Sequence, residues 1–384
     1  MTSLYTTLMD HFDDLPDPRI ERTKKHPLIN ILFIAICAVI CQADDFVEIA
    51  DFGDARREWL SQYLDLSNGV PSHDTFTRVF ASLDPTAFGE CFVAWMQTLH
   101  QLTQGRIISL DGKTLRASMD SFTGSDAIHM VSAWTSLNGL VLGQVKVDSK
   151  SNEITAIPAL LEMLDITDSI ITIDAMGTQR AIAHQIFSKD ADYVLALKGN
   201  QSSLQADIRA LFERYEQEHW RDAKDQPVSH TRFQSIDKDH GRIETRTCWA
   251  TECPTYITTE HNWSGLRSMA LVESRRQIGT KTTTERRYFI SSLPPEASKI
   301  AKAVRAHWGI ENSLHWVLDM VFNEDRARAR KDHSPNNLAT LRHIALNLIK
   351  SETTQKISIK RKRLRAALDS QYLHKIIFGT QETD

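Results

Sequence analysis

Two short apolar runs, each followed by an aspartate, constrain this chain more than any other feature. Ile107–Leu110 precede Asp111, and Ile170–Ile173 precede Asp174. Both runs have the length and β-branched content of buried strands. A carboxylate at the carboxyl end of such a strand lies where open α/β sheets usually bind ligands. Either aspartate alone is more simply a cap for the following turn, but two in one sheet favour convergence at a functional site.

The middle of the chain alternates between strand and helix patterns. Strand-like runs at 106–111, 129–136 and 140–147 are followed by a helix at 153–165, a strand at 169–174, a helix at 179–189 and a strand at 193–197. This order predicts an α/β fold with one mixed sheet. From about 200 to 295 the alternation is interrupted by an amphipathic helix near 204–217 and by strand-like pieces at 242–250 and 284–291. Further helices are expected over about 296–322 and 335–350.

Residues 1–103 have helical patterns, at 27–42, 45–63, 72–82 and 85–102. Ser72 is a candidate N-cap, and Pro85 suits the first position of a helix. Short helices with tight turns are compatible with a helix-turn-helix DNA reader, although a plain bundle is the simpler expectation. The longest apolar stretch, 28–43, is shorter than the roughly 20 residues of a membrane span, so a buried core helix and no membrane contact are expected.

Positive charge is concentrated late in the chain, although the net charge of the whole is −4. Between Arg326 and Arg365 there are twelve Lys or Arg residues and two acids. Such a segment suits nucleic acid as well as it suits a solvated tail. Five sparse cysteines and the absence of an apolar leader are typical of a cytoplasmic protein.

Glu311 is the third candidate acid. With His307 and His315 it forms an i, i+4, i+8 stripe on a helix. Leu314 and Leu318 flank this stripe, which favours a face turned to the sheet, where a glutamate needs a charged or metal partner. A surface glutamate and a zinc site are the alternatives. Three carboxylates without cysteine suit Mg²⁺ or Mn²⁺, and two such ions about 3.5–4 Å apart can drive phosphodiester chemistry.

Basic and amide side chains lie close in sequence to the candidate acids and strands, Arg305 before Glu311 and the others after an acid or a strand, and they are candidates for contacts to a phosphate backbone. They are Lys113, Arg116, Lys198, Asn200, Gln201, Arg305, Arg326 and Arg328. Each alone is more simply a solvated surface residue. The sequence has no P-loop and no G-x-G-x-x-G, so no nucleotide cofactor is expected.

Four ordered motifs resemble the DDE-class transposases of bacterial insertion sequences, above all the H-repeat-associated proteins. They are LDGKTLRAS at 110–118, IDAMGTQ at 173–179, YVLALKGNQ at 193–201 and RAHWGIENSLHWVLDMVFNED at 305–325. The opening FDDLPDPR at 12–19 also resembles the helical segment that precedes the catalytic domain in this group. The resemblance implies a ribonuclease-H-like core, a metal-binding catalytic triad of Asp111, Asp174 and Glu311, and a β-rich insertion over about 200–295.

The sequence departs from many related transposases around Glu311. Where they carry a tyrosine, an arginine and a lysine, this chain has Val304, His307 and Leu318. Arg305 and His315 are candidate substitutes, and His307 is retained as a candidate DNA contact. The departure bears on the phosphate contacts more than on the triad. Two tryptophans of this motif, Trp308 and Trp316, could stack on a base, although core packing is the simpler expectation.

With the resemblance, the sequence predicts a helical N-terminal domain over 1–103, a catalytic domain over 104–350 and a basic tail over 351–384. The expected function is metal-dependent cleavage at insertion-sequence ends and strand transfer into target DNA. The expected partners are the element ends, the target DNA and a second copy of the chain in a homodimer, because two ends must be joined. A ribonuclease-H-like nuclease without strand transfer and a catalytically inactive DNA-binding remnant are the alternatives.

Overall fold

The computed structural model describes residues 4–100, 107–119, 126–147, 152–221, 226–239 and 241–379, and it divides the chain into two compact units. The helical unit comprises residues 1–102, 112–152 and 311–384. The sheet unit comprises residues 103–111 and 153–310. These units differ from the three consecutive segments expected from the sequence. The boundary expected near residue 104 lies outside the described residues.

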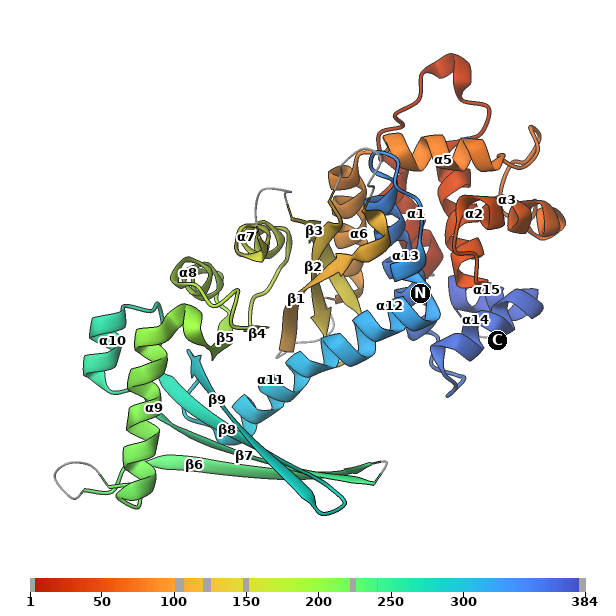
Figure 1. Ribbon diagram of the computed structural model, residues 1–384. Coiled ribbons are helices and arrows are strands. Elements are labelled where there is room, and N and C mark those ends of the chain that lie inside the picture. Colours follow the sequence, from red (N-terminus) through yellow and green to blue (C-terminus); the bar gives the residue numbers. More distant parts are fainter. Residues whose placement is uncertain are drawn as a thin grey trace, which may run out of the picture. The chain divides into compact units, whose positions relative to one another are not determined.

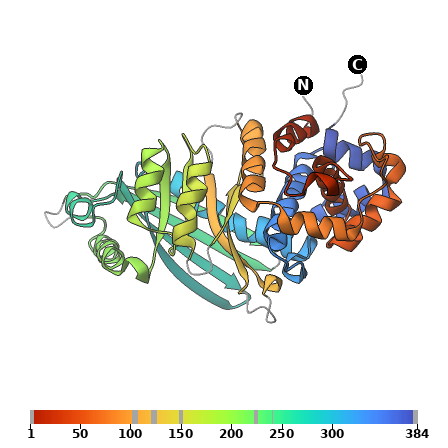
Figure 2. The same cartoon turned by 90° about the horizontal axis from the view of Figure 1, so that it is seen from above.

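Helices from both ends of the chain build the helical unit. They are α1 (Leu4–Asp13), α2 (Leu28–Ile40), α3 (Phe46–Ala55), α4 (Arg57–Leu60), α5 (His73–Ser82), α6 (Pro85–His100), α12 (Trp316–Val321), α13 (Ser334–Ser351), α14 (Ile359–Leu368) and α15 (Ser370–Phe378). The apolar run in α2 is buried at all but one position, which confirms the expected core helix. α13 is also buried along most of its length and packs against α2, α5 and α6. Figure 2 shows the N-terminal (red to orange) and C-terminal (blue) helices of this unit gathered in one group.

The segment expected to be a basic tail is folded between residues 359 and 378. In α14 the Lys362 and Arg363 side chains are buried. The Lys362 ammonium lies 3.4 Å from a Glu352 carboxylate oxygen, and the Arg363 guanidinium lies 3.6 Å from Asp44. A run of four cations is typical of solvated surface, and the two buried cations are paired with acids and with the backbone carbonyls of Ile349 and Val39. The charge pattern therefore did not reveal this packing.

The sheet unit contains a mixed sheet with the strand order β1-β4-β5-β9-β8-β7-β6. Its strands are β1 (Ile107–Leu115, whose last residues belong to the helical unit), β4 (Ile170–Ile173), β5 (Asp192–Leu197), β6 (His230–Asp239), β7 (Arg242–Glu252), β8 (Ser268–Ile278) and β9 (Lys281–Ser291). β1, β4 and β5 are parallel, and β9 to β6 continue the sheet antiparallel. This confirms an α/β fold with a mixed sheet. β2 (Ile128–Thr135) and β3 (Val141–Lys146) pair as an antiparallel hairpin in the helical unit.

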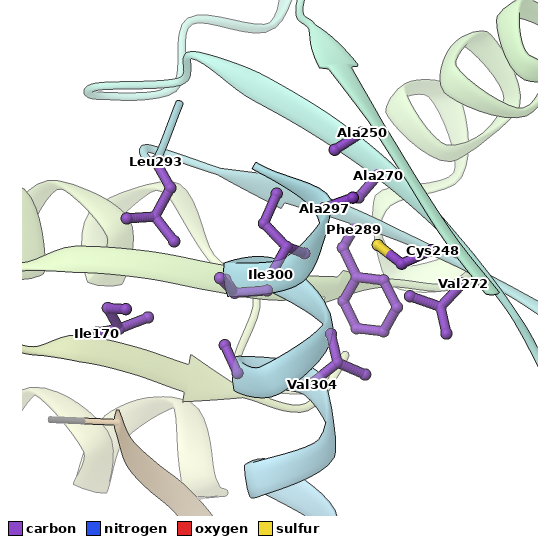
Figure 3. Packing of buried hydrophobic residues seen from close by; sticks show 12 residues of the cluster. Ile170, Cys248, Ala250, Ala270, Val272, Phe289, Leu293, Ala297, Ile300 and Val304 are labelled. Carbon is purple, nitrogen blue, oxygen red and sulfur yellow. The ribbon is translucent and has the colours of Figure 1, made fainter. Parts of the chain in front are cut away.

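Helices cover both faces of the parallel strands. α7 (Glu153–Met163) and α8 (Arg180–Ser188) lie on one face, and α11 (Ala297–Ile310) lies on the other, where it also contacts β6, β7 and β8 (Figure 1). α9 (Ser202–Gln217) and α10 (Thr255–His261) belong to the segment between β5 and β9. The core between the sheet and α11 is shown in Figure 3; its buried residues are Ile170, Val194, Cys248, Ala250, Ala270, Val272, Phe289, Leu293, Ala297, Ile300, Ala303 and Val304. This packing fixes α11 against the face of the sheet that also carries the candidate aspartates.

Candidate active site

Asp111 and Asp174 lie side by side at one end of the parallel strands. In the pairing of β1 with β4, Leu110 is opposite Ile173. Asp111 directly follows Leu110, and Asp174 directly follows Ile173. β1 continues to Leu115, whereas the sequence pattern had predicted its end at Asp111. Both aspartates are half-buried. The register therefore brings together the two acids that the sequence had selected.

Alternation along the strands places both acids on the face covered by α11. Ser109 and Thr172 are two residues before the aspartates, and their side chains share that face because strand residues alternate. The Thr172 hydroxyl donates to Ser109 Oγ at 3.0 Å. It also lies 3.2 Å from Nδ1 of His307, a residue of α11. This short polar row leads along the sheet to the two carboxylates.

Asp174 also caps the loop that follows it. Its Oδ1 accepts hydrogen bonds from the backbone N–H groups of Met176 (2.9 Å) and Gly177 (3.2 Å). A glycine is required at 177, since a Cβ there would lie 2.3 Å from Ile173 Cγ2 and 2.6 Å from Ile157 Cδ1. The capping explanation thus accounts for one oxygen of Asp174. Hydrogen bonds from the described residues reach only Oδ1.

Amide side chains after β5 hold this loop in place. The Asn200 side-chain amide donates to the Ala175 carbonyl, and Gln201 Nε2 donates to the Thr178 carbonyl at 3.0 Å. Thr178 in turn donates to the carbonyls of Asp174 (3.0 Å) and Ala196 (2.8 Å). The sequence had offered Asn200 and Gln201 as DNA ligands. In the structure their amides support the loop that carries Asp174.

His307 is a neutral partner rather than a cation. Burial lowers the pKa of its imidazole below the usual 6.5, and the nearby charge of Asp174 opposes this shift only in part. At the next position of the helix, Trp308 packs against the α11 core, as expected, and the Arg287 guanidinium carbon lies 4.2 Å from its ring centroid. A neutral imidazole can exchange a hydrogen bond with substrate but cannot neutralise a phosphate.

Glu311 begins a π-helical turn, Glu311–His315, in the helical unit. The single helix expected over 296–322 is therefore three pieces: α11, this turn and α12. Glu311 is exposed, His315 is half-buried and Leu314 is fully buried. Single π turns inside α-helices occur frequently at functional sites. Helical periodicity alone does not distinguish such a turn from a regular α-helix.

Lys113, a predicted DNA contact, forms two internal ion pairs in the helical unit. Its Nζ lies 2.5 Å from Asp319 Oδ1 and 2.5 Å from Glu324 Oε2. Burial would raise the pKa of Glu324, but the charges of Lys113 and Arg342 hold it below its usual value. Lys113 is two residues after Asp111, and Asp319 is eight residues after Glu311. The sequence pattern did not single out these two acids, whose only signal was their place in the last motif.

The other predicted DNA contacts are exposed cations in both units. In the helical unit, Arg116 lies 3.8 Å from Asp325, and Arg326 and Arg328 have no ion pair with any described residue. In the sheet unit, Arg305 lies 3.7 Å from Asp237, and Lys198 likewise has no ion pair within the described residues. Exposed pairs at such distances contribute little, so these cations remain available to an anion.

Across the described part of the chain, no helix has both the length and the apolar character that a membrane crossing requires.

The chain is similar to proteins of a known family. Residues 102–348 match the family described as "Transposase DDE domain", and residues 9–96 match "DDE_Tnp_1-associated". The "Putative transposase YncI" of Escherichia coli O157:H7 is 43% identical over 380 residues, covering 98% of this chain and 95% of the relative. The "H repeat-associated putative transposase YhhI" of Escherichia coli strain K12 is 39% identical over 378 residues, covering 97% and 98%. A solved piggyBac transposase synaptic complex with hairpin DNA aligns with 100% of this chain and 79% of its own chain, at 12% sequence identity and a TM-score of 0.40.

Proposed function

This chain belongs to the DDE transposase family, and we propose that it cleaves DNA at the ends of an insertion sequence and joins the freed ends to target DNA. In this proposal Asp111, Asp174 and Glu311 form the catalytic triad on a ribonuclease-H-like core. The observation that carries it is the register of β1 with β4, which puts Asp111 beside Asp174. Neighbouring strands are about 4.8 Å apart, close enough for two carboxylates to share one ion.

The donor chemistry of this pair fits a hard divalent cation. Both residues offer carboxylate oxygens, and the hydrogen bonds of the described residues leave Oδ2 of Asp174 for a further ligand. Oxygen donors without thiolate suit Mg²⁺ or Mn²⁺. Asp111, Asp174 and Glu311 would hold the metal, and when bound it would supply activation of the attacking hydroxyl and charge stabilisation of the leaving oxygen in phosphodiester chemistry.

The chain's own residues supply orientation and charge around these acids. The loop 175–178, tied down by Asn200, Gln201 and Thr178, keeps the Asp174 carboxylate in one orientation. His307, neutral at neutral pH, offers a hydrogen bond on the same sheet face. The exposed cations Lys198 and Arg305 of the sheet unit, with Arg116, Arg326 and Arg328 of the helical unit, would contact phosphates and so position the strand.

The test is a cleavage and strand-transfer assay on labelled DNA carrying the sequences that flank the chain's own gene. We expect nicking at the element ends and joined products with Mg²⁺ or Mn²⁺, and neither with EDTA. Asp111→Asn, Asp174→Asn and Glu311→Gln should each lower the cleavage rate by roughly 10²- to 10⁴-fold, as when a group acting in the transition state is removed.

Asp190→Asn is the matched control, because Asp190 is an exposed aspartate of the sheet unit with a left-handed backbone that asparagine tolerates. It should cleave at the wild-type rate. Triad variants that cleave as well as this control would refute the site. Cutting without joined products would indicate a nuclease, and salt-sensitive binding without cutting under either metal would indicate an inactive DNA-binding remnant.

A further inference from the structure

A cavity of about 520 Å³ opens on the helical unit, and none of its lining residues belongs to the proposed active site. The end of α4 and the following turn form one wall, with Trp59, Gln62 and Tyr63. α15 forms the other, with Gln371, His374 and Lys375 among its lining residues. We call this cavity the aromatic pocket. Its size is within the range of small-molecule and cofactor sites.

Aromatic rings hold one another in fixed positions around the aromatic pocket. The ring centroids of Trp59 and Tyr63 are 4.9 Å apart, and Tyr63 stacks on Phe378 at 4.8 Å. His374 stacks on the same Phe378 ring at 4.5 Å, and its Nδ1 lies 2.9 Å from the Tyr63 hydroxyl. Trp59, Tyr63 and His374 are only half-buried, so ring surface remains in contact with solvent. Such a preorganised set of rings suits a planar, aromatic ligand.

The polar residues of the aromatic pocket indicate what that ligand carries. Its lining includes a lysine, Lys375, and no acid, and this ammonium has no ion pair within the described chain. A cationic ligand is therefore disfavoured and an anionic one favoured. Gln62 and Gln371 are exposed and offer amide donors and acceptors, the groups that read the edges of bases.

We infer that the aromatic pocket binds an unstacked base of single-stranded DNA, with Lys375 on an adjoining phosphate. This inference rests on the proposed function only in taking DNA as the partner. Every base has a face that can stack on an aromatic ring, whereas the bases of an intact duplex are stacked on each other. The aromatic pocket should therefore prefer single-stranded or opened DNA ends to an intact duplex.

The test measures binding of a labelled single-stranded oligonucleotide to the full-length protein in EDTA, so that cleavage plays no part. Trp59→Ala should weaken this binding by about 5- to 150-fold, the usual effect of removing one base–aromatic stack, and leave the salt slope unchanged. Lys375→Gln should instead reduce the slope by about 0.7, as expected when one phosphate of a single strand is no longer neutralised. A 2-aminopurine in the oligonucleotide should be quenched by the wild type and not by Trp59→Ala.

Tyr256→Ala is the matched control, because Tyr256 is an aromatic residue of the sheet unit that is 57% exposed and lies outside the aromatic pocket. Gln371→Glu is a second test variant for the case in which Trp59→Ala misfolds. Gln371 is exposed, and its replacement only adds a negative charge to the pocket. Wild-type binding by both Trp59→Ala and Gln371→Glu, or an equal loss in Tyr256→Ala, would overturn the inference. A failure of the cleavage assay would leave this result standing, so the two proposals fail separately.

Discussion

At the scale of single residues, Lys113 makes two ion pairs inside the helical unit, with Asp319 and Glu324. Lys113→Met removes the cation and leaves Glu324, 3% exposed, with Arg342 at 4.0 Å as its remaining ion-pair partner among the described residues. Removing one partner of a buried ion pair costs about 3–5 kcal/mol, so we expect the free energy of unfolding to fall by about that amount. Urea denaturation followed by tryptophan fluorescence measures it. Adding Glu324→Gln should recover part of the loss.

Arg116→Met is the control for stability, because the Arg116 side chain is 83% exposed and its pair with Asp325 spans 3.8 Å. It should change the free energy of unfolding by less than about 1 kcal/mol. Equal effects of the two substitutions would show that Lys113 is not specially paired.

The sequence predicted Asp111 and Asp174 because a strand followed by an acid is a local pattern. It did not predict the partners of Lys113, which are 206 and 211 residues away along the chain.

At the scale of elements, α14 contains two pairs of neighbouring cations that differ in burial. Lys360 and Arg361 are exposed and have no ion pair within the described residues, whereas Lys362 and Arg363 are buried. We expect Lys360→Gln with Arg361→Gln to weaken DNA binding and lower its salt slope by about 0.9 for each phosphate that these cations neutralise in the wild type. Lys362→Gln with Arg363→Gln should instead lower the melting temperature, because Glu352 and Asp44 would lose the cations that they pair with. An unchanged salt slope in the first pair would mean that this face of α14 is merely solvated.

Elements with a periodic pattern of their own were easier to predict than elements that depend on pairing with a neighbour. The periodicity of α5 and α6 matched the structure closely, since a buried stripe repeats within the element itself. β6 and β8 were not expected, because their tips alternate charged and polar side chains on both faces and gain order mainly from pairing with β7 and β9. The π turn at Glu311–His315 was also missed, since one extra residue per turn barely alters a hydrophobic pattern.

At the scale of the whole molecule, sequence families and structural units divide the chain differently. The two family matches, 9–96 and 102–348, follow each other along the sequence. The helical unit instead combines residues 1–102 with 112–152 and 311–384. α13 explains this, because it is buried against α2, α5 and α6, and Asn337 Nδ2 donates to the carbonyls of Phe80 (2.8 Å) and Leu83 (2.9 Å). A periodic pattern predicts that α13 has a buried face but does not identify the helices that cover it.

A fragment spanning residues 104–384 tests this interdependence. Without α2, α5 and α6, the apolar surface of α13 has no cover, so we expect its amides to lose most of their protection in hydrogen exchange measured by mass spectrometry. Amides of β4 and β5, whose pairing partners all remain in the fragment, are the internal reference and should stay protected. If α13 stays as protected as in the full chain, residues 1–103 form an independent domain after all. Loss of protection confined to α13 and its neighbours would mean that deleting the N-terminal helices abolishes activity by unfolding the helical unit. The loss of activity in such a deletion would then say nothing about which residues bind DNA.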